Sequence, residues 1–191
     1  MKPTALILAA GESSRMGSPK PLLAYRGETF LDRLIGIFTP RCSAVIVVLG
    51  AAAERIREGV KRPARFVVNH DYKLGQTSSM QCGLRVMQAE TSSVLFTLAD
   101  HPAVAPETVD AVIEQSAAPV CVPRYQGKRG HPILFSRELI AEFLALAADG
   151  AARDVVRAHA GDTVFLDMDD PGIVADVDDP AAYRNLLEAR A

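Results

Sequence analysis

The chain has 191 residues, of which 49% are hydrophobic and 23% charged, and this composition is that of one ordinary soluble domain over residues 1–191. Its formal net charge is −2, and the absence of a long basic stripe argues against a nucleic-acid partner. No apolar run is long enough to cross a membrane and no cleavable signal pattern opens the chain, so we expect no membrane partner and a cytoplasmic location.

Short apolar runs that alternate with helical patterns predict the order of the elements. We expect strands at residues 5–10, 44–49, 66–68, 94–98 and 120–122, with helical patterns such as residues 30–38 and 109–113 between them. This alternation favours a parallel sheet covered by helices on both faces, whose ligands bind beyond the carboxyl ends of the strands. A polar turn at 126–130 followed by an apolar run at 132–135 predicts a ribbon or an antiparallel strand. Asp179 and Pro180 are expected to open the last helix.

The loop that follows the first predicted strand carries the strongest functional signal. Gly11 and Gly17 allow backbone angles that other residues avoid, so amide N–H groups can turn towards an anion. Arg15 and Lys20 add positive charge to the same loop. A Walker A loop would need a lysine directly after its second glycine, but Ser18 stands there, and a GxGxxG motif is also absent. The pattern therefore predicts a different kind of cradle for a nucleoside triphosphate.

Acidic residues at two points of the chain are candidate metal ligands. Asp100 directly follows a buried strand, and magnesium prefers a few carboxylate oxygens together with substrate phosphates. Asp176 and Asp178 alternate along residues 174–178, so an extended chain would turn both to one face. We take Asp178 as the second ligand and keep Asp176 as the alternative. Each of these acids also has a plainer explanation, as a turn residue or as a cap of the last helix.

The segment at residues 69–80 leads from a strand into a helix. Its small hydroxyl side chains offer hydrogen-bond donors at the positive end of the helix, which suits ligand oxygens. A simple helix cap by Thr77, Ser78 or Ser79 would explain the same pattern without any ligand. The segment is therefore a candidate part of the nucleotide site.

The first loop resembles the signature L-A-[AG]-G-x-S-x-R-M-G-x-x-K of nucleotidyltransferases. Further stretches resemble the MobA and MocA group of molybdopterin nucleotidyltransferases, namely residues 69–84, 98–104, 129–135 and 176–183, while residues 148–153 approximate the group's G-D-x-G-A-R segment. The R-G-H-P sequence and Ala10 are most similar to the cytidylyltransferase branch, MocA. The resemblance implies a Rossmann-like, three-layer αβα nucleotidyltransferase fold whose mostly parallel central sheet includes an antiparallel strand or ribbon.

The resemblance also implies a reaction, in which CMP is transferred from CTP to the terminal phosphate of molybdopterin and pyrophosphate is released. Mg²⁺ or Mn²⁺ would be the cofactor, and the product would pass to a molybdenum enzyme or its chaperone. Because a phosphate nucleophile is already anionic at neutral pH, no general base is required. The alternatives are a guanylyltransferase of the same group that uses GTP, a nucleotidyltransferase for another phosphorylated small molecule, and a non-catalytic nucleotide-binding regulator.

The matched positions give each expected site residue a role. The expected catalytic residues are Arg15, Lys20 and Asp100, and the expected metal ligands are Asp100 and Asp178. The expected nucleotide-binding residues are Leu8, Ala9, Ala10, Gly11, Ser13, Arg15, Met16, Gly17, Lys20, Asn69, Gly75, Ser78 and Ser79. The expected acceptor-binding residues are His101, Arg129, Gly130, His131 and Arg153.

Overall fold

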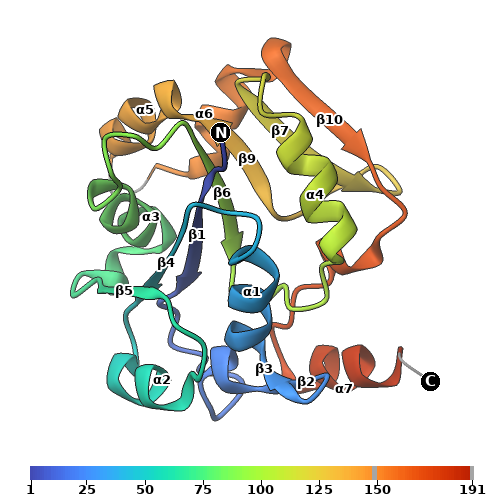
Figure 1. The fold of residues 1–191 in the computed structure, drawn as a ribbon. Coiled ribbons are helices and arrows are strands. Elements are labelled where there is room, and N and C mark those ends of the chain that lie inside the picture. The colour runs from blue at the N-terminus through green and yellow to red at the C-terminus, as the bar shows by residue number, and fades with distance from the viewer. Residues whose placement is uncertain (148–149, 190–191) are drawn as a thin grey trace.

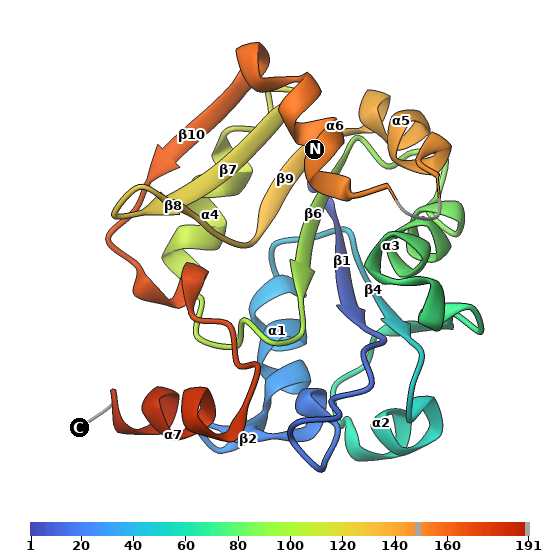
Figure 2. The same cartoon turned by 180° about the vertical axis from the view of Figure 1, so that it is seen from behind.

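The computed structural model describes residues 1–147 and 150–189, which surround a mixed β-sheet (Figures 1 and 2). The main strands follow the spatial order β10-β7-β9-β6-β1-β4-β5, with a short strand β8 paired to β7. Their bounds are β1 Thr4–Ala9, β4 Ala44–Leu49, β5 Arg65–Val68, β6 Ser93–Leu98, β7 Val120–Tyr125, β8 Lys128–Arg129, β9 Ile133–Ser136 and β10 Thr163–Asp167.

The direction of the strands confirms the predicted fold class. β9 runs antiparallel to both of its neighbours, β6 and β7, and β8 is antiparallel to β7. The other neighbouring pairs are parallel. The sheet is therefore mostly parallel, with β9 and the short β8 antiparallel to their neighbours, as expected for the predicted α/β class.

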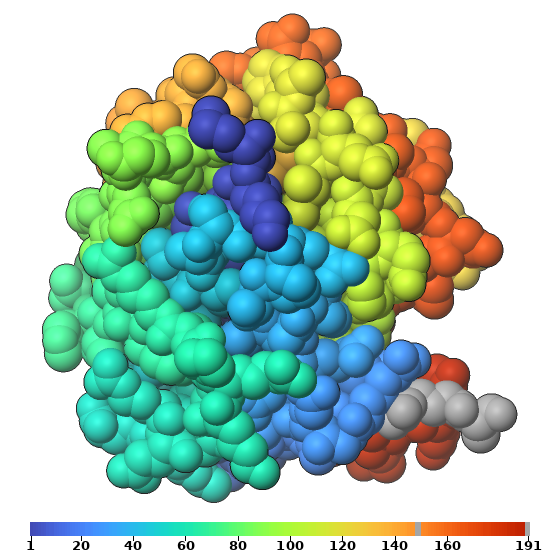
Figure 3. Space-filling model, in the orientation of Figure 1, coloured from blue at the N-terminus to red at the C-terminus, as the bar shows by residue number. Residues whose placement is uncertain are grey.

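Helices cover both faces of this sheet and make the three layers. Helices α1 (Phe30–Phe38) and α4 (Pro106–Glu114) pack on one face, and their side chains close over it in the space-filling view (Figure 3). On the other face lie α3 (Gln76–Arg85), α5 (Ile140–Ala145) and α6 (Ala152–Ala158). Helix α2 (Ala53–Gly59) follows β4. Helix α7 (Pro180–Glu188) packs beside a small hairpin made of β2 (Ala24–Tyr25) and β3 (Glu28–Thr29).

Alternation along the strand β1 explains why it is buried on both sides. Ile7 belongs to the core cluster that includes Leu34 of α1, whereas Leu6 and Leu8 belong to the cluster that includes Met80 of α3. Successive side chains of a strand point to opposite faces, so each layer is held by every second residue. Burying one such leucine or isoleucine is worth about 1.5 to 3 kcal/mol. The packing on both faces fixes the point at which the chain leaves β1 and enters the loop of residues 11–20 (the functional loop).

The segment before the last helix keeps the predicted alternation without forming a strand. Residues Pro171–Val174 form a 3₁₀ turn and residues 175–178 form no strand, because only single hydrogen bonds such as that from Val177 N to Asp100 O hold them to the rest of the chain. The burial pattern nevertheless alternates, with Val177 buried and Asp176 and Asp178 exposed. Asp179 caps α7, as predicted, by accepting hydrogen bonds from Ala181 N and Ala182 N.

Two further predictions concern the motif at residues 148–153 and the absence of a membrane-spanning segment. Of the segment at 148–153, which approximates the G-D-x-G-A-R motif, residues 148 and 149 lie outside the described part. Among the described residues, no helix is both long and apolar enough to cross a membrane.

Candidate active site

The functional loop leaves the carboxyl end of β1 and folds back on itself. Ser13 has a φ of 52° and Gly17 a φ of 67°, both in the left-handed region. The Ser13 hydroxyl accepts a hydrogen bond from the Lys20 amide at 2.9 Å, and Met16 N donates to Ser13 O at 2.9 Å. These bonds close the loop at its base. Lys20 is thereby held beside the end of the sheet, although it follows β1 by eleven positions.

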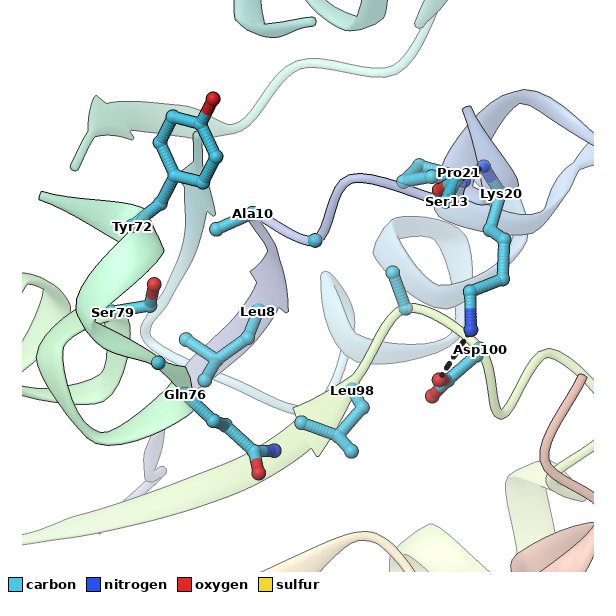
Figure 4. A pocket seen from close by; sticks show the side chains of 13 residues that line it. Leu8, Ala10, Ser13, Lys20, Pro21, Tyr72, Gln76, Ser79, Leu98 and Asp100 are labelled. Carbon is cyan, nitrogen blue, oxygen red and sulfur yellow. Dashed lines mark hydrogen bonds and ion pairs between the residues drawn. The ribbon is translucent and has the colours of Figure 1, made fainter. Parts of the chain in front are cut away.

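Lys20 joins two carboxylates that are far apart in the sequence. Its Nζ atom lies 3.2 Å from Asp100 Oδ2 and 2.8 Å from Asp178 Oδ1, and Figure 4 shows it reaching Asp100 across the end of β6. Burial by itself lowers the pKa of Lys20, but the bond to Asp178 and the charge of Asp100 raise it above its ordinary value. The hydrogen bond and charge of Lys20 lower the pKa of Asp178. Within this cluster of three side chains, Lys20 and Asp178 are therefore both charged at neutral pH.

Two histidines lie behind this cluster. Asp100 Oδ1 is buried without a hydrogen-bond partner among the described residues, and it is 3.7 Å from His101 Nε2. The ring of His101 lies 4.8 Å from that of His131, centroid to centroid. Burial lowers the pKa of His101, and it lowers that of His131 to about 3, so both rings are neutral near pH 7.

The cluster suits a small divalent cation. Asp100 and Asp178 already converge on one positive charge, and the partnerless oxygen of Asp100 has capacity for another. No group of three or more His, Cys, Asp or Glu side chains able to hold a metal occurs in the described part of the chain. Mg²⁺ is commonly bound by one or two carboxylates, with waters and substrate phosphates completing its shell. The residues present therefore fit Mg²⁺ or Mn²⁺ bound together with a nucleotide.

A first cavity, of about 360 Å³, opens next to Lys20 and Asp100 (Figure 4). It is bounded by the end of β1, the functional loop, the start of α3 and the end of β6. Its lining residues are Leu8, Ala10, Gly11, Ser13, Lys20, Pro21, Tyr72, Gly75, Gln76, Ser79, Leu98, Ala99 and Asp100. Eight of these residues were expected from the sequence to belong to the site, and the cavity brings them together.

The remaining predicted nucleotide residues lie around this cavity without lining it. These are Ala9, Arg15, Met16, Gly17, Asn69 and Ser78. Asn69 is buried, and its Nδ2 atom donates hydrogen bonds to the Ser78 and Ser79 hydroxyls, each at 3.0 Å. Asn69 thus orients the start of α3, and Ser79 is the member of this group that reaches the cavity wall.

A second cavity, of about 270 Å³, lies beside the first. Four of the predicted acceptor residues line it, namely Arg129, Gly130, His131 and Arg153. The other wall residues are mostly apolar: Gln76, Met80, Phe96, Leu98, Val122, Ile133, Phe135, Phe143, Ala152 and Val156. The fifth predicted acceptor residue, His101, does not line this cavity and contacts it through His131.

Sequence reasoning missed five residues of the first cavity's wall: Pro21, Tyr72, Gln76, Leu98 and Ala99. Tyr72 and Gln76 were not singled out, although both belong to the segment at 69–80, and Leu98 was taken only as the end of a strand. Two signals were available in the sequence: Tyr72 and Gln76 lie on either side of Gly75, and Leu98 lies two positions before Asp100.

The glycine-containing loop, the cationic side chain between two carboxylates and the two adjoining cavities define the class: an α/β enzyme that acts on a nucleoside triphosphate. Residues 5–164 match the model of the MobA-like NTP transferase domain. The chain belongs to this family.

Curated relatives carry different names. The chain is 30% identical to "Nicotine blue oxidoreductase" of Paenarthrobacter nicotinovorans, with 96% of each chain covered. It is 26% identical to "Molybdenum cofactor cytidylyltransferase" of Escherichia coli K12, covering 92% of this chain and 90% of the relative. It is 28% identical to "Probable molybdenum cofactor guanylyltransferase" of Mycobacterium avium, covering 100% and 98%. The family is thus shared by proteins named for different reactions.

Among solved structures, Rv0371c of Mycobacterium tuberculosis H37Rv superposes with a TM-score of 0.86 at 30% identity, with 98% of both chains covered. The same protein in complex with manganese gives a TM-score of 0.80 at 29% identity, covering 99% of this chain and all of that one. A structural relative has therefore been solved with a divalent cation of the kind that suits Asp100 and Asp178.

Proposed function

We propose that this protein transfers CMP from CTP to the terminal phosphate of molybdopterin and releases pyrophosphate. The observation that carries the proposal is the position of Lys20, which meets Asp100 and Asp178 at the wall of the cavity formed by the functional loop. A polyphosphate needs cationic groups and inward-facing amides, and its α-phosphate needs a cation held by carboxylates. The nucleotidyltransferase family supplies the triphosphate substrate class.

The cationic and the acidic residues of the site have different roles in binding the triphosphate. Arg15 and Lys20 hold the β- and γ-phosphates and stabilise the pyrophosphate as it leaves, since both lie on the loop beside the first cavity. Asp100 and Asp178 would hold Mg²⁺ or Mn²⁺, which when bound neutralises charge on the α-phosphate. Lys20 is released from the carboxylates as it takes up phosphate oxygens.

The acceptor binds in the second cavity. Arg129 and Arg153 lie on its wall and supply positive charge for an anionic acceptor. An oxygen of the acceptor phosphate forms a bond to the α-phosphorus of CTP, and the bond between the α- and β-phosphates breaks. The acceptor oxygen carries no proton that must be removed at neutral pH, which agrees with the neutral state of His101 and His131. The product then passes to a molybdenum enzyme or its chaperone.

Two observations favour CTP over GTP. Ala10 lines the first cavity, at a position that is similar to the cytidylyltransferase branch, and one relative is named as a cytidylyltransferase. The guanylyltransferase relative keeps GTP as the alternative nucleotide.

A second candidate function is that of an oxidoreductase. It is favoured by the relative that carries that name at 30% identity and by the mainly apolar wall of the second cavity. The pairing of Lys20 with Asp100 and Asp178 favours nucleotidyl transfer. Redox chemistry on a small molecule does not require an ammonium group held between two carboxylates beside a glycine-containing loop.

A competition assay tests the proposal. Equal amounts of CTP, GTP, ATP and UTP are mixed with the protein, Mg²⁺ and molybdopterin, and the pyrophosphate and dinucleotide products are measured. We expect a cytosine dinucleotide as the main product. A guanine dinucleotide would assign the protein to the guanylyl branch. Absence of pyrophosphate with every nucleotide would refute the proposal.

A further inference from the structure

Gln76 occupies the boundary between the two cavities. It is the first residue of α3, and its side chain extends towards Leu98 at the end of β6 (Figure 4). The first cavity lies over β1 and β6, and the second lies over β6, β9 and β7. Gln76 and Leu98 are the residues that line both cavities. Because Leu98 is apolar, Gln76 provides the polar side chain common to the two walls.

The carboxamide of Gln76 makes no hydrogen bond within the described part of the chain. Gln81, five positions later on the same helix, is different: its Nε2 atom donates to the carbonyl oxygens of Phe143, Leu144 and Leu146 at 3.1, 3.3 and 3.0 Å. Gln81 therefore ties α3 to the chain around α5, whereas Gln76 is exposed and makes no comparable contact. The amide of Gln76 is free to bind a substrate.

We propose that Gln76 binds the acceptor's nucleophilic phosphate and aligns it with the α-phosphate of the nucleotide. This assignment rests on the proposed nucleotidyl transfer, in which the two phosphates must meet where the two cavities meet. Lys20 and Asp100 line only the first cavity, and Arg129 and Arg153 line only the second. Gln76 lies between these charged groups and can donate both amide hydrogens to phosphate oxygens.

A neutral donor suits this position. The acceptor oxygen must keep its electron pair for the bond to the α-phosphorus, while the pair from the broken bond leaves on pyrophosphate. A lysine or arginine at the junction would draw charge away from the attacking oxygen. An amide orients the same oxygen by hydrogen bonding and leaves its charge in place.

The test compares Gln76→Leu and Gln76→Glu with the wild-type protein and with Gln115→Leu. Gln115 lies at the end of α4 on the opposite face of the sheet and serves as the matched control. Each protein receives CTP, or GTP if that is the better substrate, with Mg²⁺ and one of three acceptors. Transfer to molybdopterin gives the dinucleotide, transfer to inorganic phosphate gives the nucleoside diphosphate, and attack by water gives the nucleoside monophosphate. Pyrophosphate is the second product in every case.

We expect Gln76→Leu to lower transfer to both phosphate acceptors by about 10- to 100-fold, since it removes hydrogen bonds to a charged group. Hydrolysis by water, nucleotide affinity and melting temperature should stay within about twofold or a few degrees of wild type, because the side chain is exposed and does not touch the β- and γ-phosphates. Gln76→Glu should lower transfer further by repelling the acceptor, and Gln115→Leu should change nothing.

Two results would count against the assignment in different ways. An unchanged ratio of phosphate transfer to hydrolysis in Gln76→Leu, with an active wild-type protein, would overturn the role of Gln76 alone. Absence of pyrophosphate from the wild-type protein with all three acceptors would refute the proposed function and the role of Gln76 with it.

Discussion

The two cavities differ in how the chain builds them. The first takes its charged groups from one continuous loop plus two acids, and Lys20 is held there by Asp100 and Asp178. The second draws on seven elements, β6, β7, β8, β9, α3, α5 and α6, and its wall is mainly apolar apart from Gln76, His131, Arg129 and Arg153. We infer that the first cavity is specialised for a shared group, the triphosphate, and the second for the part of the reaction that varies between relatives.

We infer from this difference how proteins of one family can carry different names. The wall of the second cavity depends on single side chains from many elements, so a few substitutions change what it accepts. The predictions below separate the two regions, beginning with the largest expected effect.

The first prediction concerns Asp100. Asp100→Asn keeps the shape of the side chain but removes the charge that a divalent cation requires, so Mg²⁺-dependent pyrophosphate release should fall by at least about 1000-fold. The circular dichroism spectrum should match that of the wild type. Near-normal release would remove Asp100 from the metal site.

The second prediction concerns Lys20. Lys20→Met should lower nucleotidyl transfer by about 10- to 100-fold through loss of a charge-assisted bond to phosphate. It should also raise the affinity for Mn²⁺ in the absence of nucleotide by about tenfold, because the ammonium no longer occupies the position between Asp100 and Asp178.

Titration of Mn²⁺ by electron paramagnetic resonance measures this affinity. Arg15→Met is the control, because it removes a nearby charge of the same sign that forms no ion pair with either acid. Equal Mn²⁺ affinities in the two variants would mean that Lys20 does not compete with the metal.

The third prediction addresses the second cavity. Arg129→Ala should raise the KM for the acceptor by about tenfold and leave the KM for the nucleotide unchanged, because Arg129 lines only the second cavity. Steady-state kinetics with each substrate varied in turn provide the measurement. A rise in the nucleotide KM instead would show that the two cavities are not separate binding regions.

The last prediction concerns the stability of the fold, and it tests His131. Its folded pKa of about 3 lies below its ordinary value of 6.5, so the unfolded chain binds the proton more readily between these two values. This contribution to stability is complete above about pH 6.5 and decreases as the pH falls towards 3. His131→Phe removes the titrating group while retaining a ring against Phe96.

Between pH 7.5 and pH 5, the wild-type protein should lose about 2 kcal/mol more unfolding free energy than His131→Phe does. Urea denaturation at the two pH values measures this difference. Equal losses in both proteins would mean that His131 is protonated without cost in the fold.

Local patterns predicted most of the fold and eight of the thirteen residues that line the first cavity. Residues 30–38 form the predicted helix α1 within its predicted bounds, because Thr29 caps it and its apolar side chains recur at helical spacing. Strand β10 was not predicted, since its residues are half-buried at a sheet edge and lack a long apolar run. The positions of Gly11 and Asp100 at the carboxyl end of the sheet followed from strand order alone.

Contacts between distant segments could not be predicted in the same way. Lys20 was expected to bind phosphates, and its bridge to Asp100 and Asp178 joins residues 80 and 158 positions away. The role of Gln76 depends on two cavities that share a wall, which no local spacing records. Sequence patterns thus identify the loop, and the tertiary fold determines which side chains meet it.

The most direct test of the central claim is a crystal structure of the protein soaked with CTP and manganese. Our account predicts a triphosphate lying against residues 11–20, with Lys20 on its phosphates and the metal between Asp100, Asp178 and the α-phosphate. A nucleotide bound away from residues 11–20, with Lys20 still joined to both carboxylates, would contradict it.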